Sequence, residues 1–204
     1  MSTTVTQSKA GSPPVTAAHA MSAEAFAAWV ERPENSDRHF ELEKGEVIEL
    51  PPPKRLHGFV CANIVKVMGR HADTQPVGFV YSNDAGVIVE RGPDTVRGPD
   101  VAYFDDVQSA EDIVAEYAKV PPVIAVEVLS PDDRVNQVAL KVDEYLAFGV
   151  KQVWVVDPEA KDIAVHQVGC RCGFSARMTS CRVVTICRDF RAGSLTSFAC
   201  RDGR

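Results

Sequence analysis

Hydrophobic and polar positions early in the chain follow patterns that predict two short strands and a helix after them. Residues 39–42 and 46–50 have the strand pattern and flank the turn-like pair Lys44-Gly45. After three prolines, apolar residues recur at helical spacing, and we expect a helix over residues 55–71. A shorter helix is expected over residues 21–32. The apolar stripe of the longer helix consists of Leu56, Phe59, Val60, Ile64, Val67 and Met68.

The middle of the chain continues with short strand patterns. Residues 78–81 and 85–90 predict two strands with a turn at Asn83-Asp84 between them. Residues 91–98 are rich in Gly and Pro, which predicts a loop. A further strand is expected to start at the proline and aspartate that open residues 99–104.

The most apolar strand pattern of the chain contains a single acid. Residues 122–129 are apolar except for Glu127, which is typical of a strand that is buried on both faces. An ionised carboxylate in such a place is costly unless a cation, a hydrogen-bond donor or a metal contacts it. Ser130 is suited to be the N-cap of a helix over residues 131–148, and Gly149 is suited to end that helix. On this helix the expected apolar stripe is Val135, Val138, Val142, Tyr145 and Leu146.

Residues 152–156 and 162–165 predict a closing hairpin, and the whole order of elements indicates a mixed central β-sheet flanked by helices. This is an α/β or α+β fold. We expect a flexible lead over residues 1–20, one domain over residues 21–168, and a divergent segment over residues 169–204 that packs on the same domain.

Composition narrows the class of protein. The chain has 204 residues, enough for one domain with a substantial core, and a formal charge of −6. That charge argues against a protein whose whole surface binds nucleic acid, but it leaves room for a local basic groove. No run is long and apolar enough to cross a bilayer, so no membrane partner is expected. The first twenty residues lack the apolar core of a signal peptide, and we expect a cytoplasmic location.

The C-terminal segment differs from the rest of the chain because it holds five of the six cysteines and a net charge of +5 over residues 171–204 (seven Arg, two Asp). A zinc site is one interpretation, although the spacing lacks paired C-x2-C motifs. A disulfide framework is disfavoured in the cytoplasm. Reduced cysteines in small strands beside a basic surface are favoured. A last short helix is expected over residues 189–199.

Two acids on consecutive strand patterns suggest a metal site. Asp100 opens one strand, Glu127 lies in the next long strand, and adjacent strands would bring both carboxylates to one edge of the sheet. Two close carboxylates repel each other unless a divalent cation neutralises them. Mg²⁺ prefers such a set of hard oxygen ligands, and the backbone carbonyl of Val128 is placed to be a third.

Lys141 falls at the edge of the apolar stripe of the following helix. Its ammonium could reach a phosphate or orient a water from there. On spacing alone, a lysine that lays its stem along apolar surface and keeps its charge in water is the more common alternative.

The helix over residues 55–71 is the best candidate for contacts with phosphates, because His57 and His71 bracket it and basic residues lie nearby, namely Lys54, Arg55, Lys66 and Arg70. The alternative is a solvated helix face. His57 lacks the spacing of a metal-ligand set. The chain has no G-x-S-x-G motif, P-loop or dinucleotide fingerprint.

Several of these motifs resemble the Uma-two family, restriction-endonuclease-like proteins of the PD-(D/E)XK nuclease superfamily. The resemblance spans about residues 38–166, and the order and spacing of the motifs make it specific. The matching motifs are Phe40-Glu41-Leu42, Gly45-Glu46, Pro51-Pro52-Pro53 with His57, Pro99-Asp100, Glu127-Val128-Leu129-Ser130-Pro131, Lys141 to Val150, and Val153 to Pro158.

This resemblance implies a restriction-endonuclease-like core in which Asp100 and Glu127 bind Mg²⁺ or Mn²⁺ and nucleic acid, with DNA favoured, is hydrolysed. The usual lysine two residues after the acid is replaced by Leu129, and the family places that lysine on the next helix, where Lys141 stands. Glu41 matches an acidic position expected to face the same site, the alternative being an exposed strand-end glutamate. A homodimer is also implied. Lys44 and the tail after Val168 depart from the family pattern.

Two other classes of function stay open. A nuclease-like fold can lose turnover and remain a DNA-binding or scaffold protein. Alternatively, Glu127 pairs with Lys141 in a purely structural ion pair, which adds little net stability. Binding of a divalent metal discriminates these hypotheses: the catalytic one requires it, the structural ion pair forbids it, and a DNA-binding module is compatible with either result.

Overall fold

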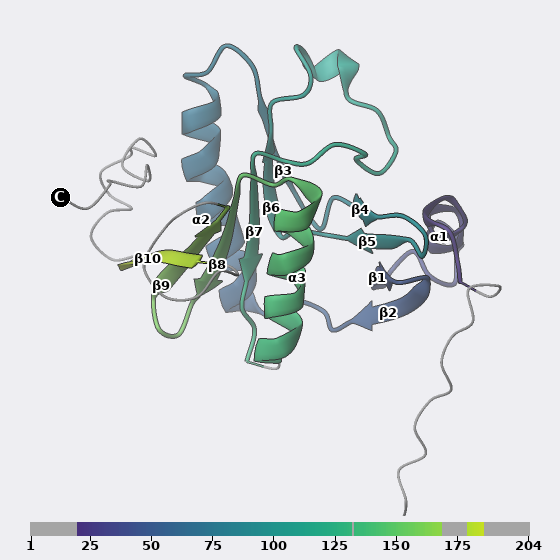
Figure 1. The fold of residues 1–204 in the computed structure, drawn as a ribbon. Helices are drawn as coiled ribbons and strands as arrows, with labels where there is room; N and C mark the ends of the chain where they lie inside the picture. Colours follow the sequence, from purple (N-terminus) through teal and green to yellow (C-terminus); the bar gives the residue numbers. More distant parts are fainter. Residues whose placement is uncertain (1–19, 132, 169–178, 186–204) are drawn as a thin grey trace, which may run out of the picture.

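The computed structural model describes residues 20–131 and 133–168 together with the backbone of residues 179–185. Within this part of the chain, two β-sheets and three α-helices form the fold (Figure 1). The helices are α1 (Ala23–Val30), α2 (Arg55–Ala72) and α3 (Val135–Phe148). The strands are β1 (His39–Glu43), β2 (Glu46–Leu50), β3 (Phe79–Ser82), β4 (Val87–Glu90), β5 (Thr95–Arg97), β6 (Val101–Phe104), β7 (Ile124–Val128), β8 (Gln152–Asp157), β9 (Asp162–Gln167) and β10 (Thr179–Thr185).

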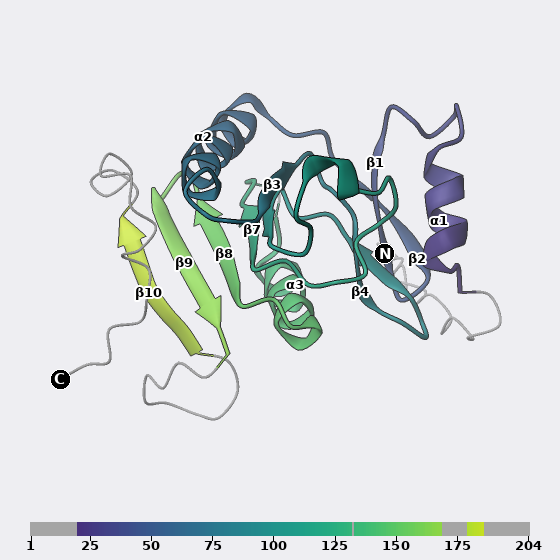
Figure 2. The same ribbon diagram turned by 90° about the horizontal axis from the view of Figure 1, so that it is seen from above.

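The larger sheet has the strand order β10-β9-β8-β7-β6-β3. Only the β7–β8 pair is parallel within it, because α3 carries the chain back across the sheet between these two strands. Helices α2 and α3 cover opposite faces of this sheet (Figure 2). The mixed α/β fold with helices on a central sheet is therefore confirmed.

Strand β7 decides which side of the sheet Glu127 faces. Val126 and Val128 pack with Ile64 and Met68 of α2, whereas Ala125 packs with residues of α3. Successive side chains of a strand point to opposite faces, so Glu127 points to the same side as Ala125, toward α3. The expected burial of β7 is confirmed, since its residues from Ala125 to Val128 are all buried.

The smaller sheet has the order β2-β1-β5-β4 and packs on α1. Its core contains Phe26 of α1 together with Leu42, Ile88 and Val96 from three of the strands. Figure 2 shows this sheet and α1 side by side at one side of the larger sheet. The sheet matters for function because β1 and β5 carry charged side chains toward α3.

One expectation for the middle of the chain is wrong. The loop expected over residues 91–98 contains strand β5, because a turn at Gly92-Pro93 returns the chain beside β4 and buries Thr95 and Val96 completely or nearly so. The two strands expected on either side of Asn83-Asp84 are present, but they do not pair with each other. Strand β3 pairs with β6 in the larger sheet, whereas β4 pairs with β5 in the smaller one.

The expected start of the helix after β7 is also wrong. Helix α3 begins at Val135 after Arg134 as N-cap, not after Ser130. The backbone N–H of Ser130 donates to the Asp133 carboxylate at 2.6 Å, and this contact closes a turn ahead of the helix. Val135 is 83% exposed at the first residue of the helix, so it does not belong to the buried stripe with Val142 and Tyr145.

Other expected elements are confirmed, namely the strands at residues 39–42 and 46–50, helix α2, the β8–β9 hairpin and the end of α3 at Gly149. Gly149 has φ +113°, the left-handed conformation that favours glycine. Strand β10 pairs antiparallel with β9. The rest of the C-terminal segment, with the expected helix over residues 189–199 and the side chains of the tail cysteines, lies outside the described residues, as does the lead before residue 20. Among the described helices, none is long and apolar enough to span a membrane.

Candidate active site

A pocket of about 530 Å³ opens beside the end of β7, between α2, α3 and the smaller sheet. It brings together five of the residues that the sequence predicted for the site. These are His57, Asp100, Glu127, Val128 and Lys141. A neighbouring pocket of about 100 Å³ adds Glu41 and Arg97 to the surroundings of Glu127 and Lys141.

Glu127 is held by two donors from α3. Its Oε1 accepts a hydrogen bond from the Tyr145 hydroxyl at 2.8 Å, and its Oε2 lies 3.2 Å from Nζ of Lys141. Burial raises the pKa of Glu127 to about 7, the nearby charge of Lys141 opposes this rise, and the charges of Asp100 and Glu41 add to it. Burial and the neighbouring negative charges thus disfavour the ionised form of this carboxyl, and Lys141 and Tyr145 offset part of that effect.

Lys141 lies between two carboxylates. Its Nζ is 2.8 Å from Oε1 of Glu41 and 3.2 Å from Oε2 of Glu127, and its side chain is 18% exposed. Burial lowers the pKa of Lys141, but the charges of Glu127 and Glu41 outweigh this and hold that pKa above its usual value. The ammonium is thus charged and fixed, and it does not extend into water along an apolar surface.

Glu41 is buried, with 2% of the residue exposed, so the alternative of an exposed strand-end glutamate is wrong. Besides Lys141, its Oε1 accepts from the backbone N–H of Gly98 at 3.2 Å, and its Oε2 accepts from Arg97 at 3.0 Å. The carboxylate of β1 therefore links a lysine of α3 to an arginine of β5.

Arg97 is a member of the site that the sequence analysis missed, because it fell in a segment expected to be a loop. Its side chain is 3% exposed and donates to Glu41 and Glu43 at 3.0 Å and to Glu144 of α3 at 2.7 and 3.1 Å. Nothing in the local sequence signals this role, since a lone Arg between Val96 and Gly98 is common on surfaces. The cluster it completes has six charged side chains, namely Glu41, Glu43, Arg97, Glu127, Lys141 and Glu144.

Asp100 is oriented by the strand next to it and by α2. Its Oδ2 accepts from the backbone N–H of Val128 at 2.6 Å, and its Oδ1 lies 3.1 Å from Nε2 of His57. The hydrogen bond to Asp100, followed by the contact with Cys61, raises the pKa of His57 to about 10. Since the Val128 peptide contacts Asp100, the carboxylate stands directly beside the strand that carries Glu127.

His57 also contacts Cys61, with 3.5 Å between Nδ1 and Sγ. The ligand atoms of His57, Cys61 and Asp100 all lie within 4.8 Å of one another, which is a grouping that could hold a metal ion. This grouping was not predicted, because the sequence spacing around His57 does not match that of a metal-ligand set. The available signal was the four-residue separation of His57 and Cys61, which places both on one face of a helix.

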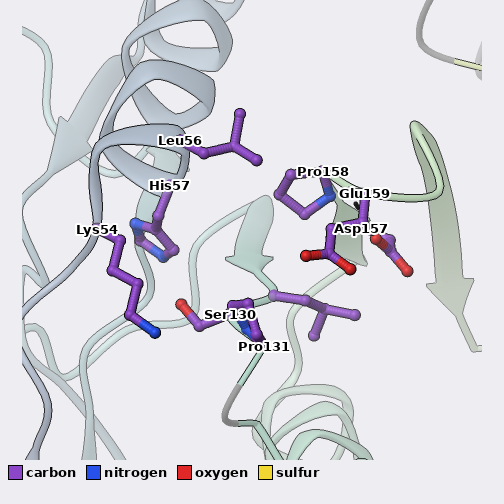
Figure 3. A pocket seen from close by; sticks show the side chains of 9 residues that line it. Lys54, Leu56, His57, Ser130, Pro131, Asp157, Pro158 and Glu159 are labelled. Carbon is purple, nitrogen blue, oxygen red and sulfur yellow. Dashed lines mark hydrogen bonds between the residues drawn. The ribbon is translucent and has the colours of Figure 1, made fainter.

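Lys54, Arg55 and His57, proposed for contacts with nucleic acid, do not all line one pocket in the structure. His57 turns inward to Asp100, whereas Arg55 is exposed on α2 and lines none of the described pockets that border His57. Lys54 lines a further pocket of about 210 Å³ with Leu56 and His57. In Figure 3 the side chains of Lys54 and His57 lie on one side of this pocket, and Asp157 and Glu159 lie on the other.

The described residues form a mixed α/β fold with a cluster of buried and half-buried charged side chains beside the pocket. A solved structure described as a "putative nuclease belonging to DUF820" from Anabaena variabilis has this fold, with a TM-score of 0.64 and 18% identity, over 81% of this chain and 84% of that one. A family model named Uma2, described as "Putative restriction endonuclease", matches residues 23–180. The chain therefore belongs to the Uma2 family. No curated protein matches it.

Proposed function

We propose that this protein is a metal-dependent endonuclease that hydrolyses phosphodiester bonds of nucleic acid, with DNA as the favoured substrate. The observation that carries the proposal is that Asp100, Glu127 and Lys141 line one pocket although they come from three separate elements. Membership of a family described as restriction endonucleases supports the same class of reaction. Lys54, Arg55 and His57 are the proposed contacts with the nucleic acid, and a homodimer in the cytoplasm is the proposed state.

The residues of the pocket fit Mg²⁺ or Mn²⁺. Asp100, Glu127 and the carbonyl of Val128 would supply hard oxygen donors, which these cations prefer. Each carboxylate oxygen already has one hydrogen-bond or ion-pair partner, and each keeps a further lone pair for a ligand bond. Burial raises the pKa of Glu127 and the charges of Asp100 and Glu41 add to the rise, and a divalent cation would relieve this repulsion. When bound, the cation supplies polarisation of the phosphate and a more acidic water.

The chain's own side chains have separate tasks in this proposal. Lys141 stabilises the negative charge that develops on the attacked phosphoryl group, because its ammonium is charged and held in the pocket. Glu41 orients that ammonium from β1. Tyr145 holds one oxygen of Glu127, so that the other oxygen stays directed at Lys141 and the pocket.

Cleavage of plasmid DNA in the presence of Mg²⁺ or Mn²⁺ tests the proposal. We expect Asp100→Asn and Glu127→Gln to abolish cleavage while circular dichroism shows a folded protein. Matched changes at exposed acids, Asp105→Asn and Glu116→Gln, should leave cleavage intact. Cleavage that survives both ligand substitutions would overturn the assignment of the site.

A second function, a DNA-binding or scaffold protein without turnover, is favoured by one observation. Glu127 and Lys141 already pair with each other, as a purely structural ion pair would. Titration calorimetry with Mg²⁺ on wild type and Glu127→Ala separates the two functions. Heat that disappears with the substitution supports catalysis, whereas no binding by folded wild type would leave the scaffold function.

A further inference from the structure

Three side chains at one wall of the pocket carry an inference that does not depend on nuclease activity. His57 and Cys61 lie one turn apart on α2, and Asp100 faces them from the start of β6. We propose that His57, Cys61 and Asp100 form a zinc site, distinct in its donors from the oxygen-only site around Glu127.

The distances between the three side chains are close to those of a metal site. Tetrahedral zinc, with Zn–N of about 2.0 Å and Zn–S of about 2.3 Å, places its ligand atoms about 3.3–3.6 Å apart. The observed contacts are 3.1 Å from His57 to Asp100 and 3.5 Å from His57 to Cys61. These contacts use the two different ring nitrogens, and zinc binds one of them. One ligand atom of each residue lies within 4.8 Å of the other two, so shifts of about an ångström would bring the set to the ligand spacing of zinc.

The donor types favour zinc over magnesium. Thiolate and imidazole suit Zn²⁺ and related transition metals, whereas Mg²⁺ takes oxygen ligands. Three protein ligands leave a fourth position open, as in zinc sites that keep a water. That position faces solvent, because all three residues line the 530 Å³ pocket.

The surroundings hold the ligands in place. The backbone N–H of Val128 fixes Oδ2 of Asp100 and leaves Oδ1 directed at His57. On the other side, Ile64 and Met68 anchor α2 to the sheet, and they lie on the same helix as the His57–Cys61 pair. A group that hydrogen-bonds to a metal ligand, as the Val128 N–H does to Asp100, orients that ligand and strengthens metal binding.

Asp100 belongs both to this site and to the proposed magnesium site. If both exist, the two cations share one carboxylate, and Zn²⁺ changes the rate of Mg²⁺-dependent cleavage. This consequence rests on the proposed function, whereas zinc binding itself does not.

The test uses Co²⁺ as a spectroscopic substitute for Zn²⁺ in a full-length chain whose five tail cysteines are changed to serine. Cys61 is then the only thiol of the chain, since the sequence has six cysteines. We expect thiolate-to-cobalt absorption at one Co²⁺ per chain, and Zn²⁺ should displace it. Cys61→Ser should remove the absorption. His57→Ala and Asp100→Asn should weaken the affinity for Co²⁺ by about tenfold or more. Loss of a residue that only hydrogen-bonds to a metal ligand already weakens metal affinity by about 10–100-fold.

Glu127→Gln is the matched control and should keep the Co²⁺ absorption while it loses Mg²⁺ binding in calorimetry. Measuring Co²⁺ absorption and Mg²⁺ binding on the same variant distinguishes a wrong zinc site from a wrong nuclease site. No absorption in the folded five-serine chain, or absorption unchanged by His57→Ala, would overturn the zinc site.

A second measurement avoids the tail substitutions. In the wild-type chain, alkylation of Cys61 by iodoacetamide is followed by mass spectrometry with and without Zn²⁺. Zinc should protect Cys61, and His57→Ala should remove the protection. Equal alkylation of wild-type Cys61 in both conditions would contradict the site and would leave a thiol that only contacts a histidine.

Discussion

Glu41 and Lys141 are one hundred residues apart in the sequence, yet their carboxylate and ammonium meet at 2.8 Å. Glu41 lies on β1 of the smaller sheet, and Lys141 lies on α3, which covers the larger sheet. Arg97 of β5 makes a second connection of this kind, to Glu144 of the same helix. Two partly buried ion pairs thus join the smaller sheet to the helix that carries the candidate catalytic lysine.

Loss of the Arg97 charge should destabilise the protein strongly. In Arg97→Met, Glu41, Glu43 and Glu144 lose their shared partner, and removal of one partner from a buried ion pair costs about 3–5 kcal/mol. Arg97→Lys should recover only part of this, because an ammonium cannot reach three carboxylates in the same planar arrangement. Urea unfolding measures both effects.

Arg38→Met is the control for this prediction. Arg38 pairs with Glu49 at the surface, with side chains 47% and 52% exposed, so its loss should leave the free energy of unfolding nearly unchanged. If the Arg38 and Arg97 substitutions lowered the free energy of unfolding equally, the buried ion pairs would contribute no more to stability than a surface pair.

Lys141→Met should separate metal binding from catalysis. Removal of the cation beside Glu127 leaves a more negative pocket, so Mg²⁺ affinity should be kept or increased. Cleavage should fall by about 10²–10³-fold, the usual effect of losing one group that stabilises transition-state charge. Calorimetry and plasmid cleavage measure the two quantities. The exposed Lys119→Met is the control, and full cleavage by Lys141→Met would refute the catalytic role.

Gly98 lies where a side chain would disturb the site. A Cβ at Gly98 would stand 2.9 Å from the backbone oxygen of Asp84, and the Gly98 N–H donates to Glu41. Gly98→Ala should therefore destabilise the fold by about 1–3 kcal/mol, as overpacking does. Thermal unfolding measures the change.

Gly58→Ala is the matched control, because a Cβ there meets nothing within 4 Å and the residue lies in helix α2. This substitution should stabilise the protein by about 0.5–1 kcal/mol. If both alanines had the same effect, the close approach at Gly98 would be without consequence.

His166 of β9 should make stability depend on pH. Burial lowers the pKa of His166 below its usual 6.5, and the charge of Asp143 offsets part of this. The unfolded chain then binds the proton more readily than the folded one, so this residue's contribution to stability falls as pH drops below about 6.5. NMR titration of the imidazole should give a pKa under that value.

Urea unfolding at several pH values checks the consequence for stability. The loss of stability at acidic pH should be smaller in His166→Gln than in wild type. A His166 pKa at or above the usual value would remove the basis of this prediction.

Local patterns determined much of the fold. The uninterrupted apolar run of β7, the helical spacing of α2 and the glycine after α3 each depend on neighbouring residues, and the structure has all three where the sequence predicts them. The same reasoning identified Glu127 as a buried acid in need of partners. Reasoning from local patterns gave the wrong start for α3, because Ser130 and Asp133 close a turn whose sequence looks like a helix N-cap.

Only the tertiary structure decided which residues contact Glu127 and the other charged side chains of the site. Strand β5 looked like a loop because three residues among glycines and prolines carry no periodic signal, and it is a strand because β1 and β4 supply hydrogen bonds on both sides. For the same reason the burial of Arg97 and Glu41 could not be seen locally. Their charges are tolerated inside because segments from distant parts of the chain bring opposite charges to them, and such contacts depend on the packing of two sheets against α3.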